Sequence, residues 1–370
     1  MGELPLLSLF CGPGGLDLGF EQSGFRSLLA LDIDPVAIDT FNWNRRHTFP
    51  PPGRVQDLAA ADPELILARW KDAAAGLRPV GIIGGPPCQA FSVSNVHKLE
   101  DDPRARLPYS YAGILAAFNR RYGLDFFVFE NVAGLANTRH SASLEAFMYE
   151  FAGAGFTVTS FFLDSASFGV PQHRNRMFIV GLNRERFNVS DFTAPSEQPR
   201  RITVRETIGH LPEPAYFSRG LRRDDIPYHV NHWCLNPRSP KFHNGALRPG
   251  EMIGRSFRTL QWDEPSWTVA YGHREMHVHP NGKRRVSIYE AMLLQGFPAH
   301  YELRGNLTDQ IRQVSDAVPP PLAKALAGDI GELIYSASAK AADAHERESG
   351  HPAQLGLFGV QTAAPRSTSA

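Results

Sequence analysis

Short apolar runs alternate with amphipathic stretches through the first half of the chain. Each continuous apolar run predicts a buried strand, and the stretches between them have the periodicity of helices. We expect strands at residues 5–10, 25–33, 79–83, 125–129, 157–163 and 177–182. We expect helices after the first strand as far as about Ser23, and at residues 35–44. This alternation is typical of an α/β fold with a doubly wound, mostly parallel sheet, which binds ligands at the carboxyl ends of its strands.

The pattern changes near Asn183. Proline, histidine, arginine and tryptophan become frequent, and a short candidate strand remains at residues 266–271. Hydrophobic periodicity returns near Val286, and residues 322–335 have the pattern of an amphipathic helix. We therefore expect a first body at residues 1–190, an irregular module at 191–283, a return segment at 284–336 that completes the first body, and a disordered tail at 337–370.

The 370-residue chain has a formal net charge of zero, but the charge is unevenly distributed. Residues 200–285 hold 15 Lys and Arg against 8 Asp and Glu, a net charge of +7, together with 7 of the 14 histidines. A basic module on a neutral body is typical of proteins that bind a polyanion such as a nucleic acid. A solvated basic surface without a partner explains the same charge, so charge alone leaves both interpretations open.

Cysteine content and the length of the apolar runs limit the class of protein. Cys11, Cys88 and Cys234 are too few and too far apart for a disulfide scaffold or a zinc site. No apolar run approaches the roughly 18–20 residues that span a bilayer, and no secretory signal is visible at the N-terminus. We expect a cytoplasmic protein without a membrane partner, in which a thiol stays reduced.

A glycine-rich turn joins the first predicted strand to the first helix, the arrangement that cradles nucleotides. Its glycines are Gly12, Gly14 and Gly15. Asp17 stands where a dinucleotide fingerprint has its third glycine, which argues against a dehydrogenase. Asp32 ends the second strand, in the place of a ribose ligand, and Asp57 follows a third edge of the same site. These features indicate an adenosine-containing ligand; the alternative is a structural turn with two helix-capping aspartates.

Three further groups carry reactive chemistry. Cys88 follows two prolines just after a strand, which would present its sulfur rigidly as a nucleophile. A small buried hydrophobic residue is the alternative for a lone cysteine. Glu130 ends an apolar strand, where a dry crevice raises a carboxyl pKa and favours proton transfer; a helix cap is the alternative. Arg174 and Arg176 alternate along a strand and so point to the same side, where they suit an anionic or carbonyl-bearing substrate.

These motifs together resemble those of DNA (cytosine-5) methyltransferases of the bacterial restriction–modification type, in the same order, from Leu7 to Ala327. The matching segments are residues 8–15, 85–89, 130–132, 172–176, 285–298 and 313–320. Two positions depart from the family. Ser8 stands where the family often has Asp, and Asp316 stands where Asn is common. The added carboxylate would either repel the carboxylate of the cofactor or pair with its ammonium group.

The resemblance implies a class I S-adenosylmethionine-dependent methyltransferase with a Rossmann-like catalytic domain and a target-recognition domain at residues 191–283. It implies catalytic roles for Cys88, Glu130, Arg174 and Arg176, and no metal. The implied binding residues for S-adenosylmethionine are Phe10, Gly12, Pro13, Gly14, Gly15, Asp32, Ile33, Asp57, Leu58, Pro86, Leu107, Asp316 and Val318. A monomer acting on double-stranded DNA is expected, in some cases beside a cognate restriction endonuclease.

The implied reaction begins with addition of the Cys88 thiolate to C6 of a cytosine flipped out of the duplex. C5 then accepts the methyl group, while Glu130 contacts the N3 edge and Arg176 the O2 edge. Residues 91–107, which include Asp102 and Arg104, resemble the family's mobile lid. Arginines of the basic module would contact phosphates and guanine edges.

Two other functions fit much of the same sequence. A tRNA cytosine-5 methyltransferase shares this architecture and cysteine, although the basic module of roughly 90 residues is longer than tRNA relatives usually carry. A catalytically silent DNA-binding relative would have lost catalytic groups, whereas Cys88, Glu130 and Arg176 are all present. Turnover on tRNA and on duplex DNA distinguishes the three functions.

The tail contains one motif that the enzyme does not explain. Gln354, Leu355, Leu357 and Phe358 resemble the short peptides that bind the bacterial replication sliding clamp. Large apolar side chains in a polar tail favour a groove on a partner, and such a tether would raise the local concentration of enzyme at new duplex. We expect a peptide of residues 349–362 to bind the clamp in a polarisation assay, and the Leu357→Ala/Phe358→Ala peptide not to bind. Equal binding by both peptides, or none at tens of micromolar, would exclude the tether.

Overall fold

The computed structural model describes residues 3–59, 61–87, 106–136, 141–187, 192–254, 256–268 and 277–349. A seven-stranded sheet with the order β3-β2-β1-β4-β5-β7-β6 forms its centre. Its strands are β1 (Leu4–Leu9), β2 (Phe25–Asp32), β3 (Gly53–Val55), β4 (Gly81–Gly84), β5 (Phe126–Val132), β6 (Phe156–Asp164) and β7 (Asn175–Asn183). All neighbours are parallel except β7, which runs antiparallel to both β5 and β6. The predicted doubly wound, mostly parallel α/β sheet is therefore confirmed.

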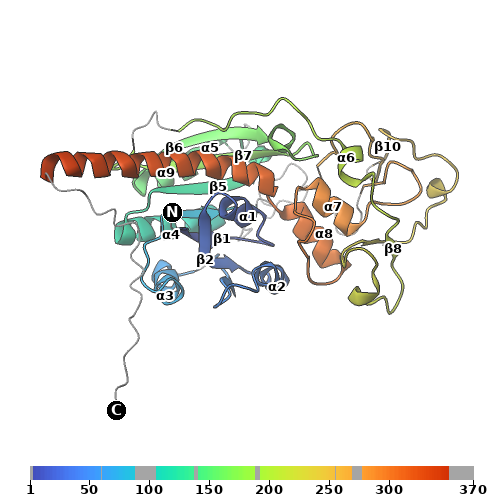
Figure 1. Ribbon diagram of the computed structural model, residues 1–370, viewed down its shortest axis with the longest axis horizontal. Helices are drawn as coiled ribbons and strands as arrows, with labels where there is room; N and C mark the ends of the chain where they lie inside the picture. The colour runs from blue at the N-terminus through green and yellow to red at the C-terminus, as the bar shows by residue number, and fades with distance from the viewer. Residues whose placement is uncertain are drawn as a thin grey trace, which may run out of the picture.

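Helices cover both faces of this sheet, which is why its central strands are apolar on both sides (Figure 1). α1 (Gly15–Glu21) and α9 (Pro320–Ser349) pack on one face, and α3 (Pro63–Ala73), α4 (Leu107–Tyr122) and α5 (Ser141–Gly153) on the other. α2 (Pro35–Asn44) has the predicted bounds. Its start is set by Pro35 and by the Asp34 side chain, which accepts a 3.0 Å bond from the Val36 main-chain N–H.

Two glycines bring α1 against the backbone of α9. A Cβ atom on Gly15 would lie 2.3 Å from the Val318 main-chain oxygen. A Cβ atom on Gly19, one turn further, would lie 2.4 Å from Ala323 Cβ and 2.5 Å from the Pro320 oxygen. No larger residue fits either contact without moving backbone atoms. The start of α9 is therefore held directly beside the glycine-rich turn at the other end of the chain.

The irregular module contains short elements and shares its core with the return segment. The elements are α6 (Val204–Ile208), β8 (Ala215–Tyr216), β9 (Trp233–Cys234), β10 (Met252–Ile253) and β11 (Phe257–Arg258), followed by α7 (Ile288–Leu294) and α8 (Leu307–Asp316). One cluster joins Trp233 and Leu260 of the module to Met292 and Val314 of the return segment. The predicted boundary at residues 283 and 284 therefore runs through a shared core, and only α9 of the return segment packs on the sheet.

Two local predictions differ from the structure. Ser266 makes a single bridge to Gln172 instead of beginning a strand, and the rest of that predicted strand lies partly outside the described residues. The predicted tail from Ala337 is helical as far as Ser349, because α9 continues beyond residue 335 and extends past the other elements (Figure 1). This part of α9 is rich in alanine, which favours a helix without tertiary contacts.

Several predicted features lie outside the described residues: Cys88, most of the lid at residues 91–107, and the motif at Gln354 and Phe358. Within the part of the chain that the structure describes, no helix is long and apolar enough to cross a bilayer. The same residues contain no cluster of side chains that would bind a metal ion.

The contact between α1 and α9 predicts the effect of a single methyl group. Gly19→Ala should lower the free energy of unfolding by about 1–3 kcal/mol, since the new Cβ atom meets backbone rather than a movable side chain. Gly328→Ala is the matched control: it lies in α9 with nothing within 4 Å, so it should stabilise the protein by about 0.5–1 kcal/mol. Urea titration of both variants checks this, and an unchanged Gly19→Ala midpoint would contradict the packing.

Candidate active site

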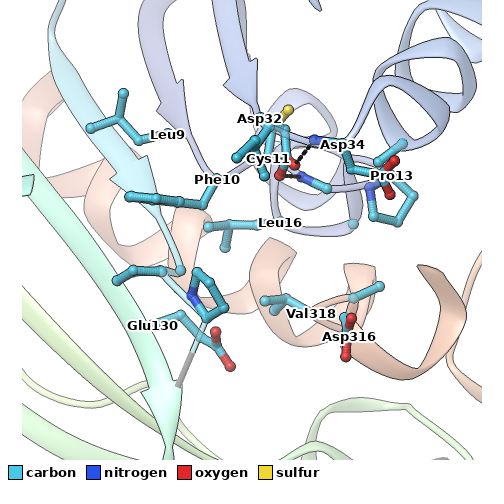
Figure 2. Close-up of a pocket in the computed structure, with 18 of the residues that line it drawn as sticks. Leu9, Phe10, Cys11, Pro13, Leu16, Asp32, Asp34, Glu130, Asp316 and Val318 are labelled. Atoms are coloured by element: carbon cyan, nitrogen blue, oxygen red, sulfur yellow. Dashed lines mark hydrogen bonds between the residues drawn. The ribbon is translucent and has the colours of Figure 1, made fainter. Parts of the chain in front are cut away.

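A cavity of about 780 Å³ lies at the carboxyl ends of β1, β2, β4 and β5, where this fold class binds its ligands. The end of α8 and the residues that follow it as far as Val318 close it from the opposite side (Figure 2). Predicted site residues that line it are Phe10, Gly12, Pro13, Gly15, Asp32, Ile33, Asp57, Leu58, Pro86, Leu107, Glu130, Arg176, Asp316 and Val318. Asp32 lies at one end of the cavity, and Glu130 and Asp316 lie toward the other (Figure 2).

The glycines of the turn have different roles. Gly12 has a φ of 53°, and a Cβ atom there would have nothing within 4 Å, so its backbone is open toward the cavity. Gly14 has a φ of 89°, and its Cβ atom would lie 2.8 Å from both Arg45 Nη1 and the Phe41 ring. Gly14 does not line the cavity and packs closely against Phe41 of α2, so its role in cofactor binding stays a prediction.

Asp32 organises the turn from the end of β2. Its carboxylate accepts a 2.9 Å bond from the Gly12 N–H and a 2.8 Å bond from the Asp34 N–H (Figure 2). Burial raises the pKa of Asp32, and these two main-chain donors oppose that shift. A carboxylate has about four lone-pair positions, so Asp32 keeps acceptors for hydroxyl groups of a ligand.

Cys11 also lines the cavity, but its environment keeps it a thiol. Burial, followed by the nearby Asp32 and Asp17 carboxylates, raises the pKa of the Cys11 thiol well above its ordinary value. The thiolate is the reactive form, so Cys11 is unsuited to nucleophilic attack.

Glu130 and Arg176 form an ion pair at the other end of the cavity. Arg176 Nε lies 3.0 Å from Glu130 Oε1, and both side chains are nearly buried. Burial raises the pKa of Glu130, while Arg176 and then Arg174 oppose the shift. The turn after β4 lies against this carboxylate, since a Cβ atom on Gly85 would be 2.6 Å from Glu130 Oε2. Gly85 leads directly into Pro86 and Pro87, which line the cavity and precede Cys88 in the sequence.

The last turn of α8 supplies residues that the sequence analysis missed individually. Gln313 and Ser315 line the cavity, and among the described residues Gln313 Oε1 and Ser315 Oγ have no hydrogen-bond partner. Arg312 also lines it and pairs with Asp34 at 2.6 Å. Gln313 and Ser315 belong to the segment that resembles the last family motif, and Arg312 directly precedes it. That resemblance is the feature of the sequence that could have identified them as site residues. Unpaired polar atoms in a cavity wall suit a polar ligand.

Asp316 projects into the cavity beside them. Within the described part of the chain its carboxylate makes no hydrogen bond or ion pair, unlike those of Asp32 and Asp34. The surrounding walls raise the pKa of Asp316 by desolvation, and Arg174 opposes this most strongly. The carboxylate is therefore available to a ligand.

The two predicted arginines occupy different places. Arg176 lines the cavity, whereas Arg174 is fully buried behind its wall and donates a 2.7 Å bond from Nη2 to the Ser315 main-chain oxygen. Their alternating positions in the sequence predicted that both arginines point to the same side, but could not predict that Arg174 is more deeply buried than Arg176. Arg174 therefore differs from the expectation that both arginines face the substrate.

Many arginines of the basic module are paired within the protein. The ion pairs are Arg200–Glu206, Arg205–Asp263, Arg222–Asp225, Arg223–Glu302 and Arg284–Glu290. Exposed cations without an ion pair among the described residues are Arg219, Arg238, Arg248 and Lys283. Among the described residues of the module, these four are fewer than the seven charges by which its cations exceed its acids.

The sheet order, the glycine-rich turn and the cavity define a class I methyltransferase fold, and comparison with known proteins agrees. A protein at 24% identity, described as an E. coli prophage DNA modification methyltransferase, superposes with a TM-score of 0.72 over 90% of this chain and 100% of its own. The Schizosaccharomyces pombe Dnmt2 methyltransferase shares the fold at 15% identity, with a TM-score of 0.59 over 90% and 99% of the two chains.

Residues 4–332 match the C-5 cytosine-specific DNA methylase family, so the chain belongs to that family and is a DNA (cytosine-5)-methyltransferase. The Type II methyltransferase M.FnuDI of Fusobacterium nucleatum is 30% identical over 358 residues, 90% of this chain and 95% of that protein. The Type II methyltransferase M.NgoPII of Neisseria gonorrhoeae is 30% identical over 355 residues, 90% and 96% of the two chains.

Proposed function

We propose that the protein methylates C5 of cytosine within a specific sequence of double-stranded DNA, with S-adenosylmethionine as methyl donor and Cys88 as nucleophile. The observation that carries this proposal is one cavity with two chemically different ends. The end at Asp32 and Gly12 suits a ribose, and the end at Glu130 and Arg176 suits a pyrimidine edge.

The residues of the cavity fit S-adenosylmethionine, which supplies a methyl group activated by a sulfonium. Asp32 has acceptors for ribose hydroxyls, and Ile33, exposed at the cavity mouth, offers an apolar surface to an adenine. The polar residues Gln313, Ser315 and Asp316 line the cavity where we place the methionine end. The volume of about 780 Å³ is within the usual range for a cofactor site.

Cys88 begins the proposed reaction as a thiolate that forms a bond to C6 of the cytosine. The electron pair of the C5–C6 double bond shifts so that C5 becomes nucleophilic and bonds to the methyl group, whose bond to the sulfonium sulfur breaks and leaves S-adenosylhomocysteine. Loss of the C5 proton then restores the double bond as the C6–sulfur bond breaks, which releases 5-methylcytosine and the Cys88 thiolate.

Glu130 and Arg176 stabilise the ring during these steps. Burial raises the pKa of Glu130, so it holds or shares a proton with N3 closer to neutral pH than an exposed glutamate would. Arg176 fixes the Glu130 carboxylate through their 3.0 Å contact and directs its guanidinium to the O2 edge. The thiolate also gains from a neighbouring guanidinium.

The target base must leave the duplex to reach a cavity of this depth. We assign the phosphate contacts to Arg219, Arg238, Arg248 and Lys283, because these cations are exposed and have no ion pair among the described residues, whereas arginines such as Arg205 and Arg284 pair within the protein. Sequence is then read by neighbouring side chains of the module. The Type II relatives support a restriction–modification role for this monomer, beside a cognate endonuclease.

One experiment distinguishes the proposed function from methylation of tRNA and from DNA binding without catalysis. DNA from a host that expresses the chain should show 5-methylcytosine in one short sequence context by bisulfite sequencing. Cys88→Ser should abolish this signal, because an alkoxide is far less available than a thiolate at neutral pH. Methylated tRNA with unmethylated DNA, or methylation by the Ser variant, would contradict the substrate or the covalent mechanism respectively.

Asp316 should affect cofactor affinity through its charge. Asp316→Asn removes a carboxylate near the proposed position of the methionine carboxylate, so the dissociation constant for S-adenosylmethionine should fall about fivefold, on the order of 1 kcal/mol. Calorimetry without DNA measures this change. Weaker binding by the Asn variant would mean that Asp316 pairs with the ammonium group instead.

A further inference from the structure

Arg174 connects the central sheet to the last turn of α8. Its fully buried side chain donates a 2.7 Å bond from Nη2 to the Ser315 main-chain oxygen. Carbonyl groups in the last turn of a helix lack partners within the helix, and a cation there also interacts favourably with the helix dipole. The bond therefore fixes the turn from which Asp316 projects into the cavity.

The main chain of Arg174 is itself held firmly. Its N–H donates a 2.9 Å bond to Asp164 Oδ1, and its oxygen accepts bonds from the N–H and the Oγ of Ser165, at 3.1 and 3.0 Å. These partners follow directly from β6, so the guanidinium extends from the edge of the sheet to α8. The position of α8 relative to the sheet thus depends on a side chain that is anchored without any ligand.

Arg174 and Arg176 act on different acids. Arg176 contacts Glu130 directly and opposes the burial-raised pKa of Glu130 more than Arg174 does. Arg174 is the strongest of the cations that oppose the raised pKa of Asp316, ahead of Arg312 and Arg176. The two arginines of one motif therefore support two different walls of the cavity, one at Glu130 on β5 and one at Asp316 on α8.

We propose that Arg174 is a positioning residue for the α8 wall of the cavity, and that only Arg176 serves the cytosine. By holding Ser315, Arg174 places the wall formed by Gln313, Ser315 and Asp316 against the methionine end of S-adenosylmethionine. Its charge also offsets the Asp316 carboxylate. This inference rests on the proposed function, because it takes the cavity to be the cofactor site.

The test measures S-adenosylmethionine binding by calorimetry on the full chain without DNA. Arg174→Met should raise the dissociation constant at least tenfold, whereas the matched Arg176→Met should change it less than threefold while losing turnover on DNA. Arg174→Lys should fall between wild type and Arg174→Met, since it keeps the charge but loses the fork geometry. Thermal unfolding identifies any variant that fails to fold. If Arg174→Met does not fold, the affinity of Arg174→Lys for S-adenosylmethionine tests the proposal.

A double-mutant cycle separates positioning from a general loss of structure. Adding Asp316→Asn to Arg174→Met should recover more affinity than Asp316→Asn does in wild type, because the uncompensated carboxylate is removed. The control Asp57→Asn lies in the same cavity and should be additive with Arg174→Met. Wild-type affinity in Arg174→Met or Arg174→Lys, or additive behaviour with Asp316→Asn, overturns the inference. Absence of binding by wild type would instead contradict the proposed function.

Discussion

The cavity depends on the close contact between two helices from opposite ends of the chain. Gly15 and Gly19 let α1 lie against the main chain at Val318, just before α9, and at Pro320, where α9 begins. That contact holds the preceding residues, including Asp316, opposite the turn that contains Gly12. Neither half forms the cavity alone, because the end at Asp32 comes from β1 and β2 and the opposing wall comes from α8. The residues that line it lie between Ser8 and Val318, near the two ends of the family match at residues 4–332.

Local sequence patterns predicted those elements whose causes are local. α2 was found with its bounds because Asp34 caps it and Pro35 starts it, and Asp32 was placed at the site because it ends an apolar strand. Contacts between distant segments were not predictable. Gly14 was predicted to bind the cofactor, and the structure packs it against Phe41 and Arg45. Arg174 was predicted to face the substrate, and in the structure its guanidinium donates a hydrogen bond to the main chain of Ser315.

Charge composition also failed to predict the basic surface, because the ion-pair partners of several arginines lie far away in the sequence. Residues 200–285 were assigned a basic surface from their composition, but Arg223 pairs with Glu302 and Arg284 with Glu290, both outside that window. Arg284 and Glu290 are almost fully buried, so their pairing supports the shared core beneath α7 rather than a nucleic-acid surface. The helical extension of α9 differs from the prediction for another reason. Its alanine content is a local signal for a helix, but its small and polar residues led to the prediction of a disordered tail.

The two departures from the family belong together. The family resemblance leads us to expect Asp at position 8 and Asn at position 316, and both Ser8 and Asp316 line the same cavity. Relative to that expected pattern the number of acidic groups is the same, with one at the wall at α8 in place of the floor at β1. The floor at Ser8 is fully buried, beside the equally buried Asp17 on α1. The wall at α8 has Arg174 behind it to offset the charge. A carboxylate is therefore better accommodated at Asp316 than beside Asp17.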